Sequence, residues 1–341
     1  MSDAKTKGND FYIHRKVALS MGTYNPKDED LHPEFKQTNT SKDLNETQFF
    51  GFSVPEARIH SVLYTWCHPN LNTMSSGVLV GQGKRTITTA IDMLDFRTFL
   101  GMDELTGGLL SYKTSGGYEV EVIEAGKTFR TKYLDRDRKN SFDVLHTAIH
   151  APCVWSSNVH FEQVMKTKGE VTIRGKRYDV DGTHVRDRSW GESRGLAPIS
   201  CPPVTWITGA FDDGFAFHVT AFDSSDLNPI WKGHFDLAPN DNLRFGWVIV
   251  DGKQAAVQSV RKLTHYDSDF MPKRVELEIG DEHGRTFTIN GEITGGFPFN
   301  PWHAARWVIC LFQWTRSGAS AKGYGDVQDG QWSDFLVAMS R

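Results

Sequence analysis

Hydrophobic and polar positions alternate with a period of two along most of this sequence. In FAFHVTAF, residues 215–222, the side chains of Phe215, Phe217 and Val219 share one face of an extended strand. In GWVIVDGKQAAVQSV, residues 246–260, two alternating runs meet at Asp-Gly, the dipeptide that best fits a type I′ turn. The pattern predicts antiparallel β-hairpins.

The same alternation recurs in both halves of the chain. It predicts a hairpin in 170–180 that turns at Gly175-Lys176, and one in 116–133 that turns at Ala125-Gly126. In the second half it predicts turns at 280–284 and at Asn290-Gly291. Helical periodicity is scarce, and two segments are candidates for short helices, 88–100 and 332–339. The expected fold class is all-β with few short helices.

A proline-rich stretch predicts where the chain divides. GLAPISCPPV, residues 195–204, contains three prolines and a glycine, which a central strand or a helix would not accept. The 341 residues also exceed the usual size of one hydrophobic core. We therefore expect two domains, 46–195 and 203–341. The first 45 residues, rich in polar side chains, are expected to form an arm over the first domain.

The amino-acid composition and charge indicate which kinds of ligand or partner the protein can bind. Aromatic residues make up 12% of the chain, which suits an aromatic β core or a pocket for a bulky apolar ligand. The net charge of −4 is spread over both halves and offers no basic stripe, so no nucleic acid partner is expected.

Targeting signals are not evident in the sequence. The N-terminal MSDAKTKGND contains no apolar run, and no stretch approaches ~18 consecutive apolar residues. We expect a cytoplasmic protein without stable membrane insertion. The four cysteines show no CxxC spacing and are expected to be reduced, buried thiols.

Three motifs imitate familiar sites. GESRG, residues 191–195, matches a nucleophile elbow with Ser193, but the prolines that follow exclude the required helix. GQGK, residues 81–84, lacks the spacing of a phosphate loop and is interpreted as a hairpin turn. HTAIH, residues 146–150, could bind zinc together with Cys153, but there is no second ligand cluster. Ordinary histidines are the preferred interpretation, and no metal or cofactor is expected.

The segment VDGTHVRDRSWG, residues 180–191, carries a more specific pattern. Its run from Arg186 to Gly191 is similar to the Asp-His-x-Trp-Gly signature of the carotenoid hydratase (hydroxyneurosporene synthase) and AttH-like superfamily. Residues 160–194 resemble an uncharacterised bacterial branch with an Arg-Asp-x-Ser-Trp-Gly version. This resemblance implies two lipocalin-like antiparallel β-barrel or sandwich domains in tandem. It also implies a site for an isoprenoid, steroid-like or polyketide-like molecule. The histidine that commonly follows the aspartate is Arg188 here.

Relatives in that superfamily hydrate alkenes or cyclise flexible chains, and the residues here fit such chemistry. Protonation of an alkene needs a carboxylic acid kept neutral by apolar surroundings, with aromatic faces to hold the cation. Asp187 is the candidate acid, because alternation turns it away from Arg186 and Arg188. Glu162 is the second candidate, sharing a face with His160. Alternatively, Asp187 ties strand ends together and arginines lower its pKa, the wrong direction for an acid.

We therefore predict a cofactor-independent lyase, hydratase or cyclase that acts on a hydrophobic small molecule. A carrier or sensor that binds such a molecule without converting it is the alternative, and a homodimer is left open. The catalytic candidates are Asp187 and Glu162. The ligand-binding candidates are His184, Arg188, Trp190, His160, Trp206, Phe217 and His218.

Overall fold

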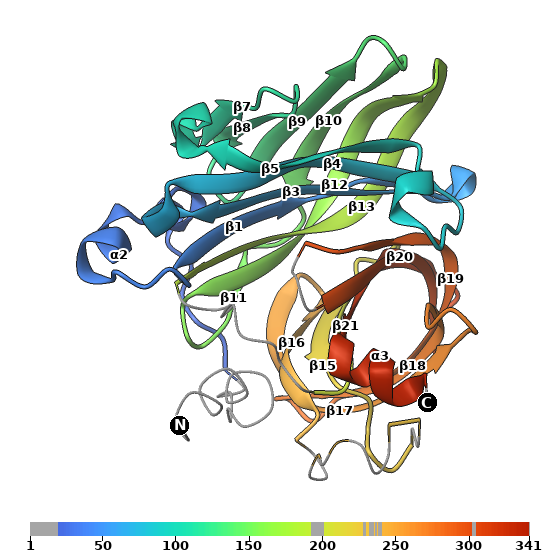
Figure 1. The fold of residues 1–341 in the computed structure, drawn as a ribbon. Coiled ribbons are helices and arrows are strands. Elements are labelled where there is room, and N and C mark those ends of the chain that lie inside the picture. Colours follow the sequence, from blue (N-terminus) through green and yellow to red (C-terminus); the bar gives the residue numbers. More distant parts are fainter. Residues whose placement is uncertain are drawn as a thin grey trace. The chain divides into compact units, whose positions relative to one another are not determined.

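The computed structural model of the chain describes residues 20–191, 201–227, 230–231, 235, 237, 241–301 and 305–340. Its strands form one large antiparallel sheet and one closed barrel (Figure 1). Between them, the described residues form only two short α-helices, α2 (Pro33–Thr38) and α3 (Ser333–Met339). The predicted all-β class with few short helices is confirmed.

The chain divides into two compact units, one over residues 22–195 and the other containing the residues from 196 onwards. We call the described residues 22–191 the first unit and the described residues 201–340 the second unit. The domain limits 46–195 and 203–341 stay a prediction, because the linker residues 192–200 lie outside the described residues. Ser193 and the rest of the GESRG motif after Gly191 fall in the same stretch.

The first unit contains thirteen strands in one sheet. Its strands are β1 (Asn45–Phe50), β2 (Ser53–Val54), β3 (Ile59–His68), β4 (Thr73–Gln82), β5 (Met93–Gly101), β6 (Thr106–Leu109), β7 (Ser111–Lys113), β8 (Glu119–Glu124), β9 (Thr128–Asp135), β10 (Asn140–Ala148), β11 (Cys153–Val154), β12 (His160–Ile173) and β13 (Lys176–Gly191). Short 3₁₀ segments accompany them, namely η2 (Pro26–Glu29), η3 (Pro55–Ala57), η4 (Pro69–Leu71), η5 (Thr88–Ala90) and η6 (Met102–Glu104).

The order of the main strands is β5-β4-β3-β1-β13-β12-β10-β9-β8-β7-β6, with β2 beside β3 and β11 beside β12. The sheet is bent strongly enough for its two ends to share one core. Tyr112 of β7 shows this, because its hydroxyl group is 2.7 Å from Thr65 Oγ1 of β3 and donates to Gln48 Oε1 of β1. The core face thereby becomes the inside of an incomplete barrel.

The second unit is a closed eight-stranded barrel (Figure 1). Its strands are β14 (Val204–Phe211), β15 (Ala216–Ala221), β16 (Leu243–Val250), β17 (Lys253–Tyr266), β18 (Pro272–Asp281), β19 (Thr286–Phe299), β20 (Ala305–Arg316) and β21 (Lys322–Trp332). Large apolar side chains such as Phe217, Phe312 and Trp314 fill its interior. Lys262 and Thr264 also point inward, since they pair with the core residues Leu277 and Val275.

The turns predicted from the sequence can be compared one by one with those in the structure. The hairpin at Asp251-Gly252 is confirmed, with both residues at positive φ, 51° and 72°. The predicted turn at Asn290-Gly291 is wrong, because β19 continues through it. A side chain on Gly291 would collide with the ring of Trp314, so this glycine admits a tryptophan rather than making a turn. The turn in 170–180 lies one residue earlier, at Arg174-Gly175.

The predicted helix at 332–339 is confirmed by α3, but the one at 88–100 is wrong. There the chain forms only η5, and residues 93–101 pair with β4 as strand β5. Pairing with a neighbouring strand overrides a weak local helical pattern. The four cysteines are buried thiols that are not joined in disulfides, as expected. Within the described ranges, no helix is long and apolar enough to cross a membrane.

Candidate functional site

The motif at 186–191 lies in β13 and presents different chemistry on the two faces of the sheet. Because side chains alternate along a strand, Arg186 and Arg188 point to one face and Asp187 and Ser189 to the other. The sequence therefore separates the two positive charges from the carboxylate that lies between them.

Arg186 is buried and binds the segment that precedes the sheet, residues 20–44, which we call the arm. Its Nη1 and Nη2 atoms donate to Glu29 Oε2 and Oε1 at 2.8 and 2.7 Å, and Nε donates to Gln163 Oε1 at 2.8 Å. Its guanidinium carbon lies 4.0 Å from the ring centre of Phe129. Burial alone would raise the pKa of Glu29, but the charge and hydrogen bonds of Arg186 outweigh it and lower this pKa.

Arg188 holds a second part of the same arm. Its nitrogen atoms donate to the carbonyl oxygens of Asp28, Asp30 and Thr47 and to the carboxylate of Glu46. His32 stacks on Trp190, with ring centres 4.6 Å apart. Arg188 and Trp190 thus fix residues 28–32 to the sheet. Both were predicted ligand-binding residues; in the structure they contact residues 28–32 and the neighbouring strands β1 and β12.

The opposite face of β13 gathers the predicted acids. Glu162 of β12 lies directly opposite Asp187, and His160 of β12 lies directly opposite Ser189. On the other side of β13, Phe49 and Thr47 of β1 are the direct neighbours of Asp187 and Ser189. Direct neighbours in an antiparallel sheet have Cβ atoms about 4.5–5.5 Å apart. We call the face that carries His160, Glu162, Asp187 and Ser189 the carboxylate face.

Three residues of this face form a chain of hydrogen bonds. Ser189 Oγ is 2.6 Å from His160 Nδ1, and His160 Nε2 is 3.2 Å from Glu162 Oε1. Ser189 and His160 are buried, and Glu162 is only 1% exposed. Each ring nitrogen of His160 therefore has a partner on this face. Asp187 is less buried and stands beside the glutamate end of this chain.

Aromatic rings border the carboxylate face. The Trp155 ring meets the His160 ring edge to face at 4.8 Å. Phe49 beside Asp187 contacts Tyr64, with ring centres 6.2 Å apart, and Trp66 lies opposite Thr47. Cys153 lies opposite Glu162, and burial, reinforced by the Glu162 charge, raises the pKa of its thiol. The Cys153 thiol is therefore uncharged, and it borders this face as an apolar side chain rather than as a nucleophile.

The remaining predicted ligand-binding residues lie in other surroundings. His184 is buried in the first unit, its ring 5.1 Å from that of His60. Phe217 belongs to the core of the barrel. Trp206 contacts Trp307, and His218 is 2.9 Å from the hydroxyl groups of both Thr208 and Thr220. The structure thus brings together His160, Glu162 and Asp187. Sequence reasoning missed Ser189, although its alternation with Asp187 was a usable signal.

The HTAIH histidines are held by protein groups. His146 lies in strand β10, where its Nε2 atom is 2.9 Å from Thr131 Oγ1, and burial lowers its pKa to about 3. His150 accepts a hydrogen bond from the Val164 amide at 3.0 Å, and burial lowers its pKa to about 4. These contacts fit the preferred interpretation of ordinary structural histidines.

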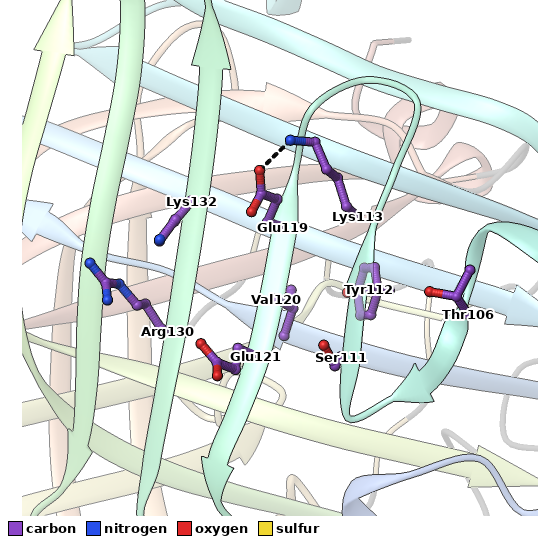
Figure 2. Close-up of a pocket in the computed structure, with 9 residues that line it drawn as sticks. All are labelled: Thr106, Ser111, Tyr112, Lys113, Glu119, Val120, Glu121, Arg130 and Lys132. Atoms are coloured by element: carbon purple, nitrogen blue, oxygen red, sulfur yellow. Dashed lines mark hydrogen bonds and ion pairs between the residues drawn. The ribbon is translucent and has the colours of Figure 1, made fainter.

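A pocket of about 270 Å³ lies elsewhere in the first unit, over strands β7 to β9 (Figure 2). Its charged side chains largely neutralise one another. Figure 2 shows Lys113 reaching toward Glu119, and the two form an ion pair of 2.5 Å. Arg130 binds Asp143 through two hydrogen bonds of 2.8 Å. None of the predicted site residues lines this pocket.

Comparisons with known proteins extend the picture. The profile of a family described as a domain of unknown function, DUF7064, matches residues 25–334. A search of curated proteins gave no match. An AttH-type protein of solved structure from Nitrosomonas europaea is 14% identical, with a TM-score of 0.61 over 92% of this chain and 98% of its own. The structure of CghA is 11% identical, with a TM-score of 0.58 over 95% and 97%.

At these identities the likeness concerns the fold. This chain shares its fold with these two proteins, and the expected all-β architecture of two lipocalin-like antiparallel units in tandem is confirmed. The first unit is an open form of such a lipocalin-like fold, a bent sheet, and the second unit is a closed barrel.

Proposed function

The chain belongs to the DUF7064 family, and from this premise we propose that it is an enzyme that transfers protons to and from an apolar substrate on the carboxylate face of the first unit. The reaction is a hydration, its reverse, or a proton-assisted cyclisation, without a cofactor. The observation that carries the proposal is the chain of hydrogen bonds Ser189–His160–Glu162 beside Asp187.

Asp187 is the proton donor in this proposal. Asp187 is the less buried of the two residues, and we assign it the contact with the substrate for this reason. Two carboxylates directly opposite each other on neighbouring strands repel, and a proton on one of them relieves this repulsion. The guanidinium groups of Arg186 and Arg188 bind Glu29 and Glu46 on the other face of β13.

In a hydration, the proton of Asp187 would add to one alkene carbon and leave a cation on the other. Water would then bond to the cation and lose a proton to the Glu162–His160 pair, which returns it to Asp187. The rings of Phe49 and Trp155 lie close enough to this region to favour a cation. In a cyclisation, Asp187 would instead donate a hydrogen bond to a carbonyl group.

The substrate that fits these neighbours is a hydrophobic molecule of isoprenoid, steroid-like or polyketide-like type. Its apolar parts would contact Phe49, Tyr64 and Trp66, and its reacting carbons would lie near Asp187. The barrel of the second unit also holds buried carboxyl groups, but Lys262 pairs with Asp223, and Thr205 and Gln331 donate hydrogen bonds to Asp329.

The test uses the whole protein and an extract of the apolar metabolites of its own cells. The purified protein is incubated with the extract in water labelled with ¹⁸O and deuterium, and the mixture is analysed by mass spectrometry. A hydratase adds one labelled water to a compound, and a cyclase changes its retention at unchanged mass. A compound that the protein retains unchanged in native mass spectrometry, without any conversion, favours the carrier or sensor and contradicts the enzyme.

A further inference from the structure

Thr47 carries a buried hydroxyl group that the fold of the first unit does not use. The residue is 0% exposed, and its Oγ1 atom has no hydrogen-bond partner among the residues that the structure describes. Most buried hydroxyl groups are paired, because an unpaired one loses its hydration without compensation. Thr65, on the neighbouring strand β3, shows the usual case, since its hydroxyl lies 2.7 Å from both Ser76 Oγ and Tyr112 Oη.

The position of Thr47 links this hydroxyl to the carboxylate face. Thr47 lies between Ser189 on one neighbouring strand and Trp66 on the other, and Ser189 in turn lies opposite His160. Direct neighbours in a sheet point to the same face, so the unused hydroxyl stands beside the serine end of the hydrogen-bond chain.

The backbone of Thr47 is held on several sides. Its carbonyl oxygen accepts a hydrogen bond from Arg188 Nη1, and its strand β1 is paired with both β3 and β13. The hydroxyl therefore cannot move far to find another partner. A fixed donor and acceptor of this kind, next to aromatic side chains, suits recognition of a polar atom on a largely apolar molecule.

We propose that Thr47 is a ligand-binding residue whose hydroxyl group hydrogen-bonds a hydroxyl or carbonyl oxygen of the substrate. This inference rests on the proposed function, and it narrows the substrate class. The substrate is an oxygen-bearing apolar molecule rather than a pure hydrocarbon, and its oxygen lies at the Ser189 end of the site. A site built to pair a polar atom discriminates against the analogue that lacks it.

The test compares Thr47→Val with a matched control. Valine keeps the shape of threonine and removes the hydroxyl group. Thr167→Val removes another buried hydroxyl that has no partner among the described residues, on β12. Thr167 lies at an odd position of β12, on the face opposite to His160 and Glu162. Thr47→Ser, which keeps the hydroxyl group, serves as the conservative variant.

The probes are three pairs of an oxygenated molecule and its hydrocarbon: farnesol and farnesene, naphthol and naphthalene, and testosterone and androstane. Their affinities are measured by quenching of tryptophan fluorescence. We expect the wild type and Thr167→Val to bind at least one oxygenated member about tenfold more tightly than its hydrocarbon, the worth of one hydrogen bond. Thr47→Val should lose this preference and Thr47→Ser should keep it.

Binding of none of the six probes, or a preference that Thr47→Val retains, overturns the inference. The measurement needs no turnover, so it separates the two proposals. Loss of the preference in Thr47→Val without any conversion of metabolites would leave the binding role and remove the enzyme. Conversion of a metabolite together with an unchanged preference in Thr47→Val would support the enzyme and overturn the binding role of Thr47.

Discussion

The guanidinium group of Arg186 holds the carboxylate of Glu29 through two hydrogen bonds of 2.7 and 2.8 Å, across 157 positions of the sequence. Both side chains are buried. The motif that contains Arg186 therefore acts on two faces of one strand. Its arginines hold residues 28–32 on one face, and Asp187 and Ser189 point to the other face.

Breaking this ion pair should destabilise the first unit. Arg186→Met leaves Glu29 as a buried charge without its cation, which costs about 3–5 kcal/mol. Unfolding in urea measures the change. The exposed Arg177, which pairs with Glu170 and Asp179, is the matched control, and Arg177→Met should cost less than about 1 kcal/mol. Equal effects of the two substitutions would contradict the buried role of Arg186.

His146 should make the stability of the first unit depend on pH. Burial lowers its pKa from 6.5 to about 3, so the unfolded chain takes up the proton first and stability falls as the pH drops from about 6.5 towards 3. This one residue should contribute about 1.4 kcal/mol per pH unit within that window. His146→Gln should reduce the pH dependence by about this amount in urea unfolding at pH 7, 6 and 5, and His150, whose pKa burial also lowers, should keep part of it.

The exposed His283 is the control for this experiment. His283 lies in the second unit, so His283→Gln should leave the pH dependence of the first unit as it is in the wild type. A slope between pH 6 and 5 that His146→Gln does not reduce would show that the imidazole is protonated in the folded chain.

The barrel contains a buried ion pair that should matter in the same way. Lys262 Nζ lies 2.5 Å from Asp223 Oδ1, and both residues are buried. Lys262→Met removes the ammonium group from this buried carboxylate and should cost about 3–5 kcal/mol in urea unfolding of the second unit. Lys253→Met, at an exposed position of the same strand, should change stability by less than about 0.5 kcal/mol. A loss in Lys262→Met no larger than this control would be the contrary result.

The sequence predicts the fold class and much of the hairpin pattern because these depend on neighbours along the chain. Alternation and the Asp251-Gly252 dipeptide are local signals, and both proved right. The turn expected at Gly291 failed for a non-local reason, since the ring of Trp314, on another strand, occupies the space over that glycine. The helix predicted over 88–100 was wrong for a similar reason, because residues 93–101 pair with β4 and form strand β5.

In the candidate site, too, the local features were predictable and the non-local ones were not. Alternation along 186–189 correctly separates Asp187 from its neighbouring arginines, and the strand at 160–162 places His160 and Glu162 on one face. The register that sets Glu162 opposite Asp187 and His160 opposite Ser189 comes from pairing of two long strands, and no local pattern encodes it. The contacts of Arg188 and Trp190 with the arm depend on residues more than a hundred positions away.

The same two strands provide an internal control for the carboxylate pair. Glu170 and Asp179 lie directly opposite each other on β12 and β13, like Glu162 and Asp187, but Asp179 is exposed and Glu170 is partly exposed. Substituting either pair changes the same charges on the same strands.

The most direct test of the proton-transfer site compares the conversion of a metabolite by Glu162→Gln and Asp187→Asn with that by Glu170→Gln and Asp179→Asn. Loss of a general acid or base lowers a rate by about a hundredfold or more. We predict that each substitution at 162 or 187 does so, and that each exposed counterpart stays within about twofold of the wild type. Conversion at the wild-type rate by Glu162→Gln and Asp187→Asn would contradict the account.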